Sequence, residues 1–144
     1  MAEGPAPNDL KCHVGEMKTR ILIVEDDEGV QEYVRNTLTG AGYESEIARD
    51  GEEAIAVMNK SPFGLVILDL FMPKLGGFQT IARLKQECPT AKVLAISGGG
   101  HYPIGDALLV AKRIGAHGTL QKPFTPQQLV AEVTRLVSGK EPTA

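Results

Sequence analysis

The chain has 144 residues, of which 42% are hydrophobic and 23% are charged, and its formal net charge at pH 7 is −3. This composition is typical of a globular domain and excludes a disordered tail protein, a collagen-like repeat and a coiled coil. The acidic balance, the absence of tryptophan and the 5% content of aromatic residues argue against a nucleic-acid-binding surface. No apolar run reaches the roughly 18 residues of a membrane span, and two cysteines are too few for a disulfide scaffold. We therefore expect a cytoplasmic protein.

The first 18 residues differ from the rest of the sequence. They contain proline, glycine and polar residues without an apolar period, so residues 1–18 are predicted to form a flexible extension. Regular patterning covers residues 19–139, and residues 140–144 form a short tail. The patterned part predicts one domain and leaves no length for a separate output domain.

Five segments have the pattern of β-strands. Residues 21–24, 65–68 and 93–96 are apolar throughout, which is typical of strands buried on both faces of a parallel sheet. Residues 43–48 and 119–121 are more polar, which favours the edges of the sheet.

Five segments have helical spacing or helix-start signals, and they alternate with the strands. Three of them are given by their helical spacing: residues 30–41, 78–88 and 104–114. In the second of these, Ile81, Ala82 and Cys88 are expected on the inner side. The other two are given by the residues that start them, Asp50 with Glu53 and Thr125 with Pro126 and Gln128. This alternation predicts an α/β fold, a (βα)5 three-layer sandwich with a parallel five-stranded sheet. The strand order 2-1-3-4-5 satisfies both right-handed crossovers and the polar edges.

Polar residues follow four of the five predicted strands. They are the acidic run Glu25-Asp26-Asp27-Glu28, Asp69, Ser97 and Lys122. Because the carboxyl ends of parallel strands meet at the edge where ligands bind, we expect these side chains to converge. Each alone also has a structural explanation, as a helix N-terminus, a turn residue or a surface lysine. Their convergence favours a functional site.

The chemistry of these residues indicates phosphoryl transfer. Crowded carboxylates repel one another unless a cation intervenes, and oxygen ligands in a small acidic pocket suit Mg²⁺. Lys122 and the Ser97 hydroxyl could bind the oxygens of an incoming phosphoryl group. Asp69 is the natural nucleophile and would form an aspartyl phosphate, without a general base because a carboxylate is already ionised at neutral pH.

Four motifs in this order resemble the receiver domains of bacterial two-component response regulators. They are Ile21-Leu-Ile-Val-Glu-Asp-Asp27, Leu68-Asp-Leu-Phe-Met-Pro73 with Gly77, Ala95-Ile-Ser97, and Lys122-Pro-Phe124. The resemblance covers about residues 20–138. It implies a flavodoxin-like fold and a stand-alone, single-domain regulator similar to those of chemotaxis.

The resemblance also implies a role for each matching residue. It makes Asp69 the phosphoacceptor, Asp26 a direct Mg²⁺ ligand, Glu25 a ligand through water, Phe71 a ligand through its backbone carbonyl, Ser97 the switch hydroxyl and Lys122 the phosphate contact. The Lys122–Pro123 bond is expected to be cis. Asp27 lies one place beyond the acidic pair, and it either tunes the pocket or caps the first helix.

This sequence departs from the family pattern at three places. Thr119 stands where the family usually has the switch aromatic, three residues before the lysine, and Gly76 replaces the usual acidic residue before the motif glycine. The fourth strand is followed by Gly98-Gly-Gly-His-Tyr102, for which we expect mobility. His101 or Tyr102 could cover the pocket in place of the missing aromatic, or both could be ordinary loop residues.

The resemblance implies a signalling module rather than an enzyme. Its partners would be a sensor histidine kinase or histidine phosphotransfer protein and a downstream protein target, with no direct contact to nucleic acid or membrane. The chain would be a monomer or a phosphorylation-dependent dimer.

Two other functions share parts of this pattern. A small aspartate-nucleophile phosphatase would usually carry a second acid two residues after Asp69, where this chain has Phe71, which cannot donate a proton. A flavodoxin-like cofactor binder would need a phosphate-binding loop after the first strand, where this chain has acids. The receiver interpretation is therefore favoured.

Overall fold

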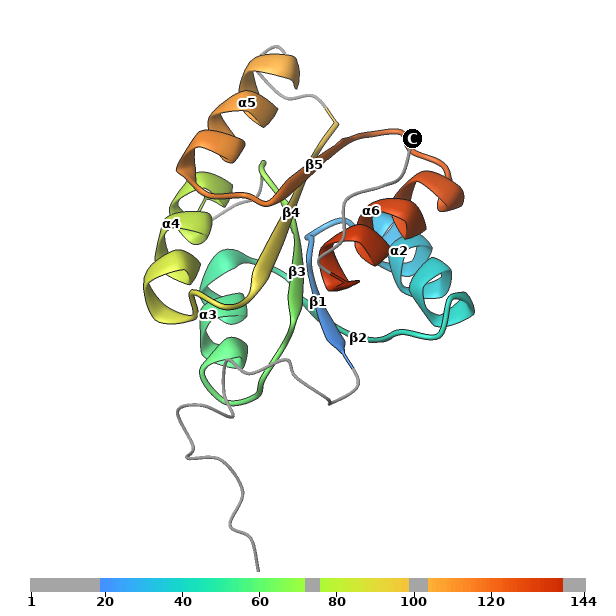
Figure 1. Ribbon diagram of the computed structural model, residues 1–144, viewed down its shortest axis with the longest axis horizontal. Helices are drawn as coiled ribbons and strands as arrows, with labels where there is room; N and C mark the ends of the chain where they lie inside the picture. Colours follow the sequence, from blue (N-terminus) through green and yellow to red (C-terminus); the bar gives the residue numbers. More distant parts are fainter. Residues whose placement is uncertain (1–18, 72–75, 99–103, 139–144) are drawn as a thin grey trace, which may run out of the picture.

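The computed structural model describes residues 19–71, 76–98 and 104–138. Within these ranges strands and helices alternate along the chain (Figure 1). The elements are β1 (Arg20–Val24), α2 (Glu28–Gly40), β2 (Glu44–Ala48), α3 (Gly51–Met58), β3 (Leu65–Asp69), α4 (Gly77–Glu87), β4 (Lys92–Ser97), α5 (Ile104–Ile114), β5 (Gly118–Gln121) and α6 (Pro126–Ser138). The expectations for residues 1–18 and 140–144, Met72, Pro73, His101 and Tyr102 lie outside the described residues. None of the described helices is both long and apolar enough to cross a membrane.

The five strands form one parallel sheet in the order β2-β1-β3-β4-β5, which confirms the predicted topology. Val24 is paired with Ala48 on one side and with Leu68 on the other, and Asp69 is paired with Ile96. The carboxyl ends of the central strands are therefore level with one another. The edge strands β2 and β5 are partly exposed, as their polar sequences predicted, whereas β3 is buried throughout.

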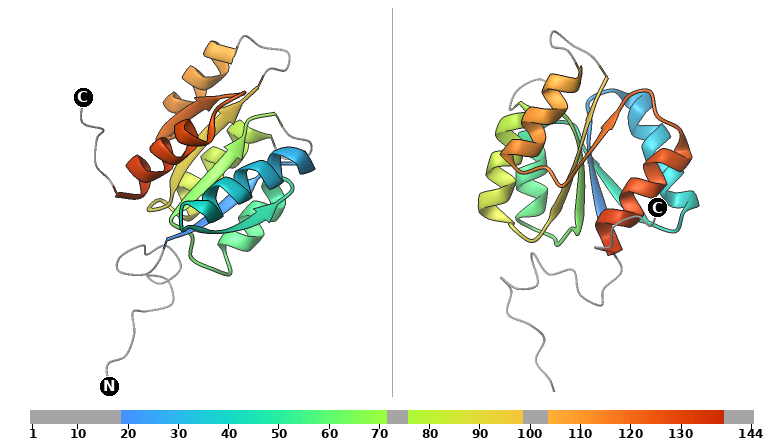
Figure 2. Two further views of the ribbon diagram at one scale, coloured as in Figure 1. Left: turned by 90° about the vertical axis from the view of Figure 1, so that its right-hand side faces the viewer. Right: turned by 45° about the horizontal axis from the view of Figure 1, so that its top comes forward.

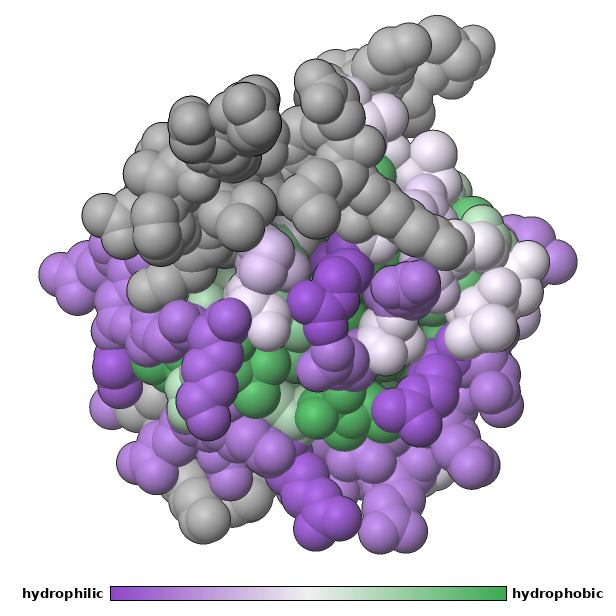
Figure 3. Space-filling view, turned by 90° about the horizontal axis from the view of Figure 1, so that it is seen from below, coloured by the Kyte–Doolittle hydropathy of each residue, from purple (hydrophilic) through white to green (hydrophobic). Residues whose placement is uncertain are grey.

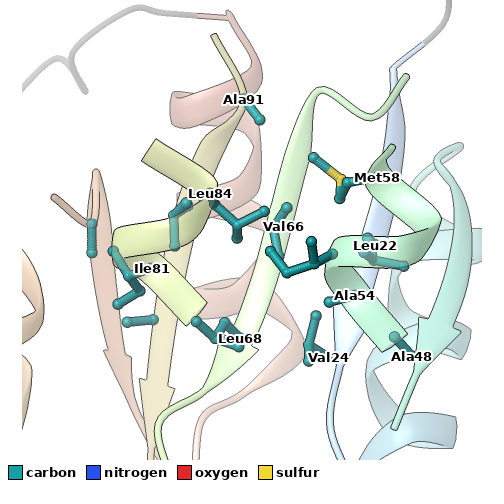
Figure 4. Close-up of a cluster of buried hydrophobic side chains, with 14 of the residues drawn as sticks. Leu22, Val24, Ala48, Ala54, Met58, Val66, Leu68, Ile81, Leu84 and Ala91 are labelled. Carbon is teal, nitrogen blue, oxygen red and sulfur yellow. The ribbon is translucent and has the colours of Figure 1, made fainter. Parts of the chain in front are cut away.

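Helices cover both faces of the sheet and make a three-layer sandwich. Figures 1 and 2 show α3, α4 and α5 on one face and α2 and α6 on the other. Alternate strand residues point to opposite faces. Leu22 and Val24 therefore pack in the core under α3, α4 and α5 (Figure 4), and Ile21 and Ile23 pack in the core under α2 and α6.

Helix starts follow the predicted capping residues. The Asp27 carboxylate accepts a hydrogen bond from the Val30 amide at 3.0 Å, so the predicted helix cap is present. The predicted cap at Asp50 is likewise present, with a 2.9 Å bond from the amide of Glu53. Thr125 and Gln128 exchange two bonds, from the Gln128 amide to the Thr125 hydroxyl and from the Thr125 amide to the Gln128 side chain.

The inner face of α4 differs from the prediction. Ala82 is exposed, and Thr80 and Leu84 are buried instead. The buried positions 77, 80, 81, 84 and 88 have the i, i+3, i+4 spacing of one helix face, and position 82 does not lie on it. Gly77 on this face lies so close to the Leu70 backbone that a β-carbon there would be 2.5 Å from the Leu70 Cα. Thr80 can be buried because its hydroxyl donates to the Gly76 carbonyl at 2.8 Å.

His117 ties β5 to the beginning of β4, at the end of the sheet opposite the acidic residues. Its amide donates to the Val93 carbonyl at 2.8 Å, and its Nδ1 accepts from the Val93 amide at 3.0 Å. Burial, followed by the charges of Lys85 and Lys92, lowers the pKa of the imidazole to about 4. The ring is therefore neutral at neutral pH.

Seen from below, where the strands begin, the described surface is mainly hydrophilic around a smaller apolar area (Figure 3).

Candidate functional site

Three carboxylates meet at the carboxyl ends of β1 and β3. Glu25, Asp26 and Asp69 each have an oxygen that lies within 4.8 Å of the others. Glu25 and Asp69 are buried, with 1% and 5% of their surface exposed, whereas Asp26 is exposed. The convergence expected from the strand ends is thus present in the structure for these three side chains.

Glu25 forms three hydrogen bonds, through its amide, its carboxylate and its backbone carbonyl. Its amide donates to the Ala48 carbonyl at 3.0 Å, which continues the pairing of β1 with β2. Its carboxylate accepts from the Asp27 amide at 3.2 Å. The Gln31 side-chain amide donates to the Glu25 carbonyl at 2.6 Å. These bonds fix the turn that carries the acidic pair.

Gln31 was missed by the sequence reasoning. It is 9% exposed and shares the buried stripe of α2 with Val34 and Leu38. The spacing 31, 34, 38 is that of one helix face, so a glutamine on an otherwise apolar stripe was the available signal. A buried amide needs a hydrogen-bond partner, and the Glu25 carbonyl supplies it.

Asp69 is the last residue of β3. One of its carboxylate oxygens accepts from the Phe71 amide at 3.2 Å. The next amide, that of Leu70, donates to the Ile96 carbonyl at 3.0 Å and keeps the chain against β4. Phe71 itself is half-buried, and the metal-binding role of its carbonyl stays a prediction.

Lys122 brings a positive charge to the two buried carboxylates. Its Nζ lies 3.3 Å from Glu25 Oε1 and 3.5 Å from Asp69 Oδ2. The Lys122 amide donates to the Ser97 carbonyl at 2.9 Å, and the bond to Pro123 is cis, as predicted. A β-carbon on Gly98 would lie 2.7 Å from the Lys122 side chain, so glycine permits this close approach.

The charges in the site are unbalanced. Burial, followed by the neighbouring charge of Asp69, raises the pKa of Glu25 to about 7, although Lys122 opposes the shift. Burial lowers the pKa of Lys122, but the charges of Asp69 and Glu25 outweigh it and the pKa is raised. One ammonium thus contacts two of the three clustered carboxylates, Glu25 and Asp69. Such a set of oxygen donors, with charge left to neutralise, fits a divalent cation.

Ser97 ends β4 beside this cluster. Its side chain is fully buried, and its hydroxyl has no hydrogen-bond partner among the described residues. Such a group costs free energy unless something supplies a partner. Its neighbour in the sheet is Gln121, next to Lys122. Thr119, which stands in place of the switch aromatic, is half-buried and paired with Ala95.

A cavity of about 580 Å³ lies between α2 and the segment after β5, and it shares Lys122 with the acidic cluster. We call it the side pocket, and its wall is formed by Asp27, Gly29, Val30, Tyr33, Gly98, Lys122, Pro123 and Phe124. The Tyr33 hydroxyl donates to the Phe124 carbonyl at 2.7 Å, and the two rings lie 5.8 Å apart between centroids. The sequence reasoning did not find this pocket.

Comparisons with known proteins agree with this geometry. A family model described as the response regulator receiver domain matches residues 21–134. Among curated proteins, the chain is 32% identical over 126 residues to the response regulator MprA of Mycobacterium sp. (strain KMS), covering 88% of this chain and 54% of MprA. It is 34% identical over 116 residues to the probable transcriptional regulator ycf27 of Pyropia yezoensis, covering 81% of this chain and 46% of that protein. The chain thus spans about half the length of these curated relatives.

Solved structures give the same result. The chemotaxis protein CheY4 of Vibrio cholerae matches with a TM-score of 0.74 and 31% identity, over 83% of this chain and 99% of that one. A putative response regulator of Chloroflexus aurantiacus matches with a TM-score of 0.77 and 32% identity, over 85% of this chain and 99% of that one. Both similarities extend over nearly the whole of the compared chain.

Proposed function

The chain belongs to the response regulator receiver domain family, and on that premise we propose that it accepts a phosphoryl group on Asp69 in a two-component pathway. The donor is the phosphohistidine of a sensor histidine kinase or of a histidine phosphotransfer protein. The chain then signals in the cytoplasm through phosphorylation-dependent protein contacts or passes the phosphoryl group on. Receiver domains are phosphoacceptor signalling modules rather than enzymes that turn over a substrate.

The juxtaposition of Asp69 with Lys122 carries this proposal. Asp69 is a buried carboxylate at a strand end, and Lys122 Nζ lies 3.5 Å from its Oδ2. A carboxylate oxygen of Asp69 forms the new bond to phosphorus, and the bond from phosphorus to the histidine nitrogen breaks. The Lys122 ammonium then binds a phosphoryl oxygen, and the unpartnered Ser97 hydroxyl donates to another.

The residues that would hold Mg²⁺ are those of the acidic cluster. Receiver domains bind this ion in an acidic pocket, and Glu25, Asp26 and Asp69 supply oxygen donors within 4.8 Å of one another. Asp26 would be a direct ligand, Glu25 a ligand through water, and Phe71 would contribute its backbone carbonyl. When bound, the ion neutralises charge on the phosphoryl oxygens.

The output follows from the movement of Ser97 and Lys122 toward the phosphoryl group. Phosphorylation adds roughly −1.5 to −2 charges, and both residues adjoin β4 and β5. Their displacement favours one arrangement of the face formed by α5, β5 and α6. On α5 the side chains of Leu109 and Val110 are 53% and 43% exposed, which suits an apolar protein contact. With Thr119 in the sheet, this change proceeds without the usual aromatic.

The direct test is phosphorylation by a small donor. The protein is incubated with Mg²⁺ and acetyl phosphate and its intact mass is measured. We expect the mass of one added phosphoryl group, absent in Asp69→Asn and retained in Asp50→Asn, a matched aspartate that caps α3. An unlabelled wild type that binds Mg²⁺, or an Asp69→Asn variant that is still labelled, would contradict the proposal. Turnover of small phosphoesters would instead favour the phosphatase.

A further inference from the structure

The side pocket shares part of its wall with the proposed phosphoacceptor site. Lys122 and Gly98 border the pocket, and Lys122 also contacts Asp69 and Glu25. A molecule that presents a phosphoryl group to Asp69 can therefore place an attached group in the pocket. Because both spaces share the Lys122 side chain, contacts in the pocket can position the phosphorus.

The far wall of the side pocket is apolar. Beyond Lys122 the lining consists mainly of Val30, Tyr33, Pro123 and Phe124. The polar tip of Tyr33 is already engaged, since its hydroxyl donates to the Phe124 carbonyl at 2.7 Å. This bond and the tilted contact between the Tyr33 and Phe124 rings hold the wall in place. The pocket therefore offers apolar contact area rather than free hydrogen-bond donors.

The volume of the pocket suits a small molecule. Ligand pockets typically measure about 300–1,000 Å³ and are mostly apolar with few polar groups, and this one measures about 580 Å³. A single methyl group would leave most of it empty. An acyl chain of several carbons would cover Val30 and Tyr33 and would gain from the burial of each methylene.

We propose that the side pocket binds the acyl group of a small-molecule acyl phosphate, and that the chain therefore accepts phosphoryl groups faster from acyl phosphates with longer acyl chains than from acetyl phosphate. The inference rests on the proposed phosphoacceptor function of Asp69. An Asp69 carboxylate oxygen forms the bond to phosphorus, and the bond from phosphorus to the acyl oxygen breaks. Its electron pair leaves with the carboxylate product, so no proton is transferred.

The test compares donors that differ only in chain length. Acetyl and butyryl phosphate release carboxylates of nearly equal basicity, so their intrinsic reactivity is matched. Each buried methylene contributes roughly fourfold, so we expect butyryl phosphate to label Asp69 at a rate between about threefold and fifteenfold higher at the same low concentration. Phosphoramidate, which has no acyl group, serves as the reference donor. Labelling is followed by intact mass over time in the presence of Mg²⁺.

Variants of the pocket wall separate the inference from the proposed function. Tyr33→Ala removes part of the apolar wall and should reduce the ratio of butyryl to acetyl labelling rates toward one. Tyr33→Phe loses the bond to the Phe124 carbonyl but keeps the ring, so it should retain more of this ratio than Tyr33→Ala does. Tyr43→Ala is the matched control, because Tyr43 contacts Thr134 and does not line the pocket.

Each outcome has one reading. If acetyl phosphate labels Asp69 and butyryl phosphate is no faster, the inference is overturned and the phosphoacceptor function stands. If the ratio survives Tyr33→Ala, the preference arises elsewhere and the inference is also overturned. If no small donor labels the wild type, both fail. A Tyr33→Ala effect confined to protein phosphodonors would make the pocket a protein contact instead.

Discussion

The Gln31 side-chain amide donates to the backbone carbonyl of Glu25 at 2.6 Å, which ties helix α2 to the end of β1. Both residues are buried, so this bond has little competition from water. It holds the turn in which Glu25 and Asp26 are placed opposite Asp69. The acidic cluster is therefore organised partly by a residue that bears no charge.

Replacing Gln31 by leucine should weaken both the fold and the metal site. The buried Glu25 carbonyl would lose its partner, and we expect the free energy of unfolding to fall by about 1–3 kcal/mol. Mg²⁺ affinity should fall as well, because the turn is released. Urea denaturation and Mg²⁺ titration measure the two effects. The control is Gln127→Leu at an exposed position of α6, which should change neither the unfolding free energy nor the Mg²⁺ affinity. Unchanged Mg²⁺ affinity in a folded Gln31→Leu variant would contradict the positioning role.

Glu25 should make the stability of the metal-free protein depend on pH. Its folded-state pKa of about 7 lies above the ordinary value of 4.5, so the folded state binds the proton more tightly between these pH values. The unfolding free energy should therefore fall as pH rises from about 4.5 to about 7, by about 1–3 kcal/mol. Glu25→Gln should lack this pH dependence. As pH rises through the same range, the unfolding free energy of the variant should therefore increase relative to that of the wild type.

Mg²⁺ binding should depend on pH for the same reason. A cation competes with the proton on Glu25, so Mg²⁺ affinity should rise as pH increases toward about 7 and then level off. Titrations at several pH values check this, with Glu32→Gln, an exposed glutamate on α2, as the control that keeps the wild-type profile. An affinity that does not change between about pH 5 and pH 8 would contradict the predicted titration.

His117 should act in the opposite direction at the other end of the sheet. Its folded-state pKa is about 4 and the ordinary value is 6.5, so the unfolded chain takes up the proton first as pH falls. The unfolding free energy should therefore decrease by about 1–3 kcal/mol as pH falls between these values. His117→Gln retains a hydrogen-bond acceptor for the Val93 amide and should lose this component. Denaturation curves measure the unfolding free energy of the wild type and of His117→Gln. If it decreases equally in both proteins as pH falls, His117 does not make this contribution.

Gly77→Ala should be strongly destabilising. The new methyl group would lie 2.5 Å from the Leu70 Cα and 2.7 Å from its carbonyl oxygen, so α4 or the segment after Asp69 must move. We expect a loss of about 2–3 kcal/mol in urea denaturation. Gly40→Ala is the matched control: it is helical with nothing within 4 Å of the added carbon, and it should stabilise by up to about 1 kcal/mol. Equal stabilities of the two variants would contradict the close-approach interpretation.

Most of the fold was predictable because its signals are local. Uniform apolar runs predicted β1, β3 and β4, and helical spacing predicted the helices that cover them. The polar edges then favoured the strand order 2-1-3-4-5, which places the two polar strands outside and satisfies the rule of right-handed crossovers. The error at Ala82 was an error of helical phase, because the buried face of α4 runs through Gly77, Ile81 and Leu84.

The residues of the site were likewise predictable, but their burial and their hydrogen-bond partners were not. Glu25, Asp69 and Lys122 follow strands, and parallel strands bring such positions together. That Glu25 is buried and Asp26 exposed could not be read from two adjacent acids. The Gln31 bond, the neutral His117 and the side pocket also depend on partners in other elements.

By itself, the sequence determined the order of the elements, the edge of the sheet at which chemistry-bearing residues collect, and the family. The element order and the edge follow from periodicity and strand-end position, which act over a few residues of chain, and the family follows from the resemblance of the four motifs. Only the tertiary structure decided which carboxylate is buried, how closely Lys122 approaches it and where the side pocket opens. Lys122 and Glu25 are 97 residues apart and yet lie 3.3 Å from each other. Burial and charge coupling at that range exist only after the sheet has assembled, and they set the pKa values on which the proposed chemistry depends.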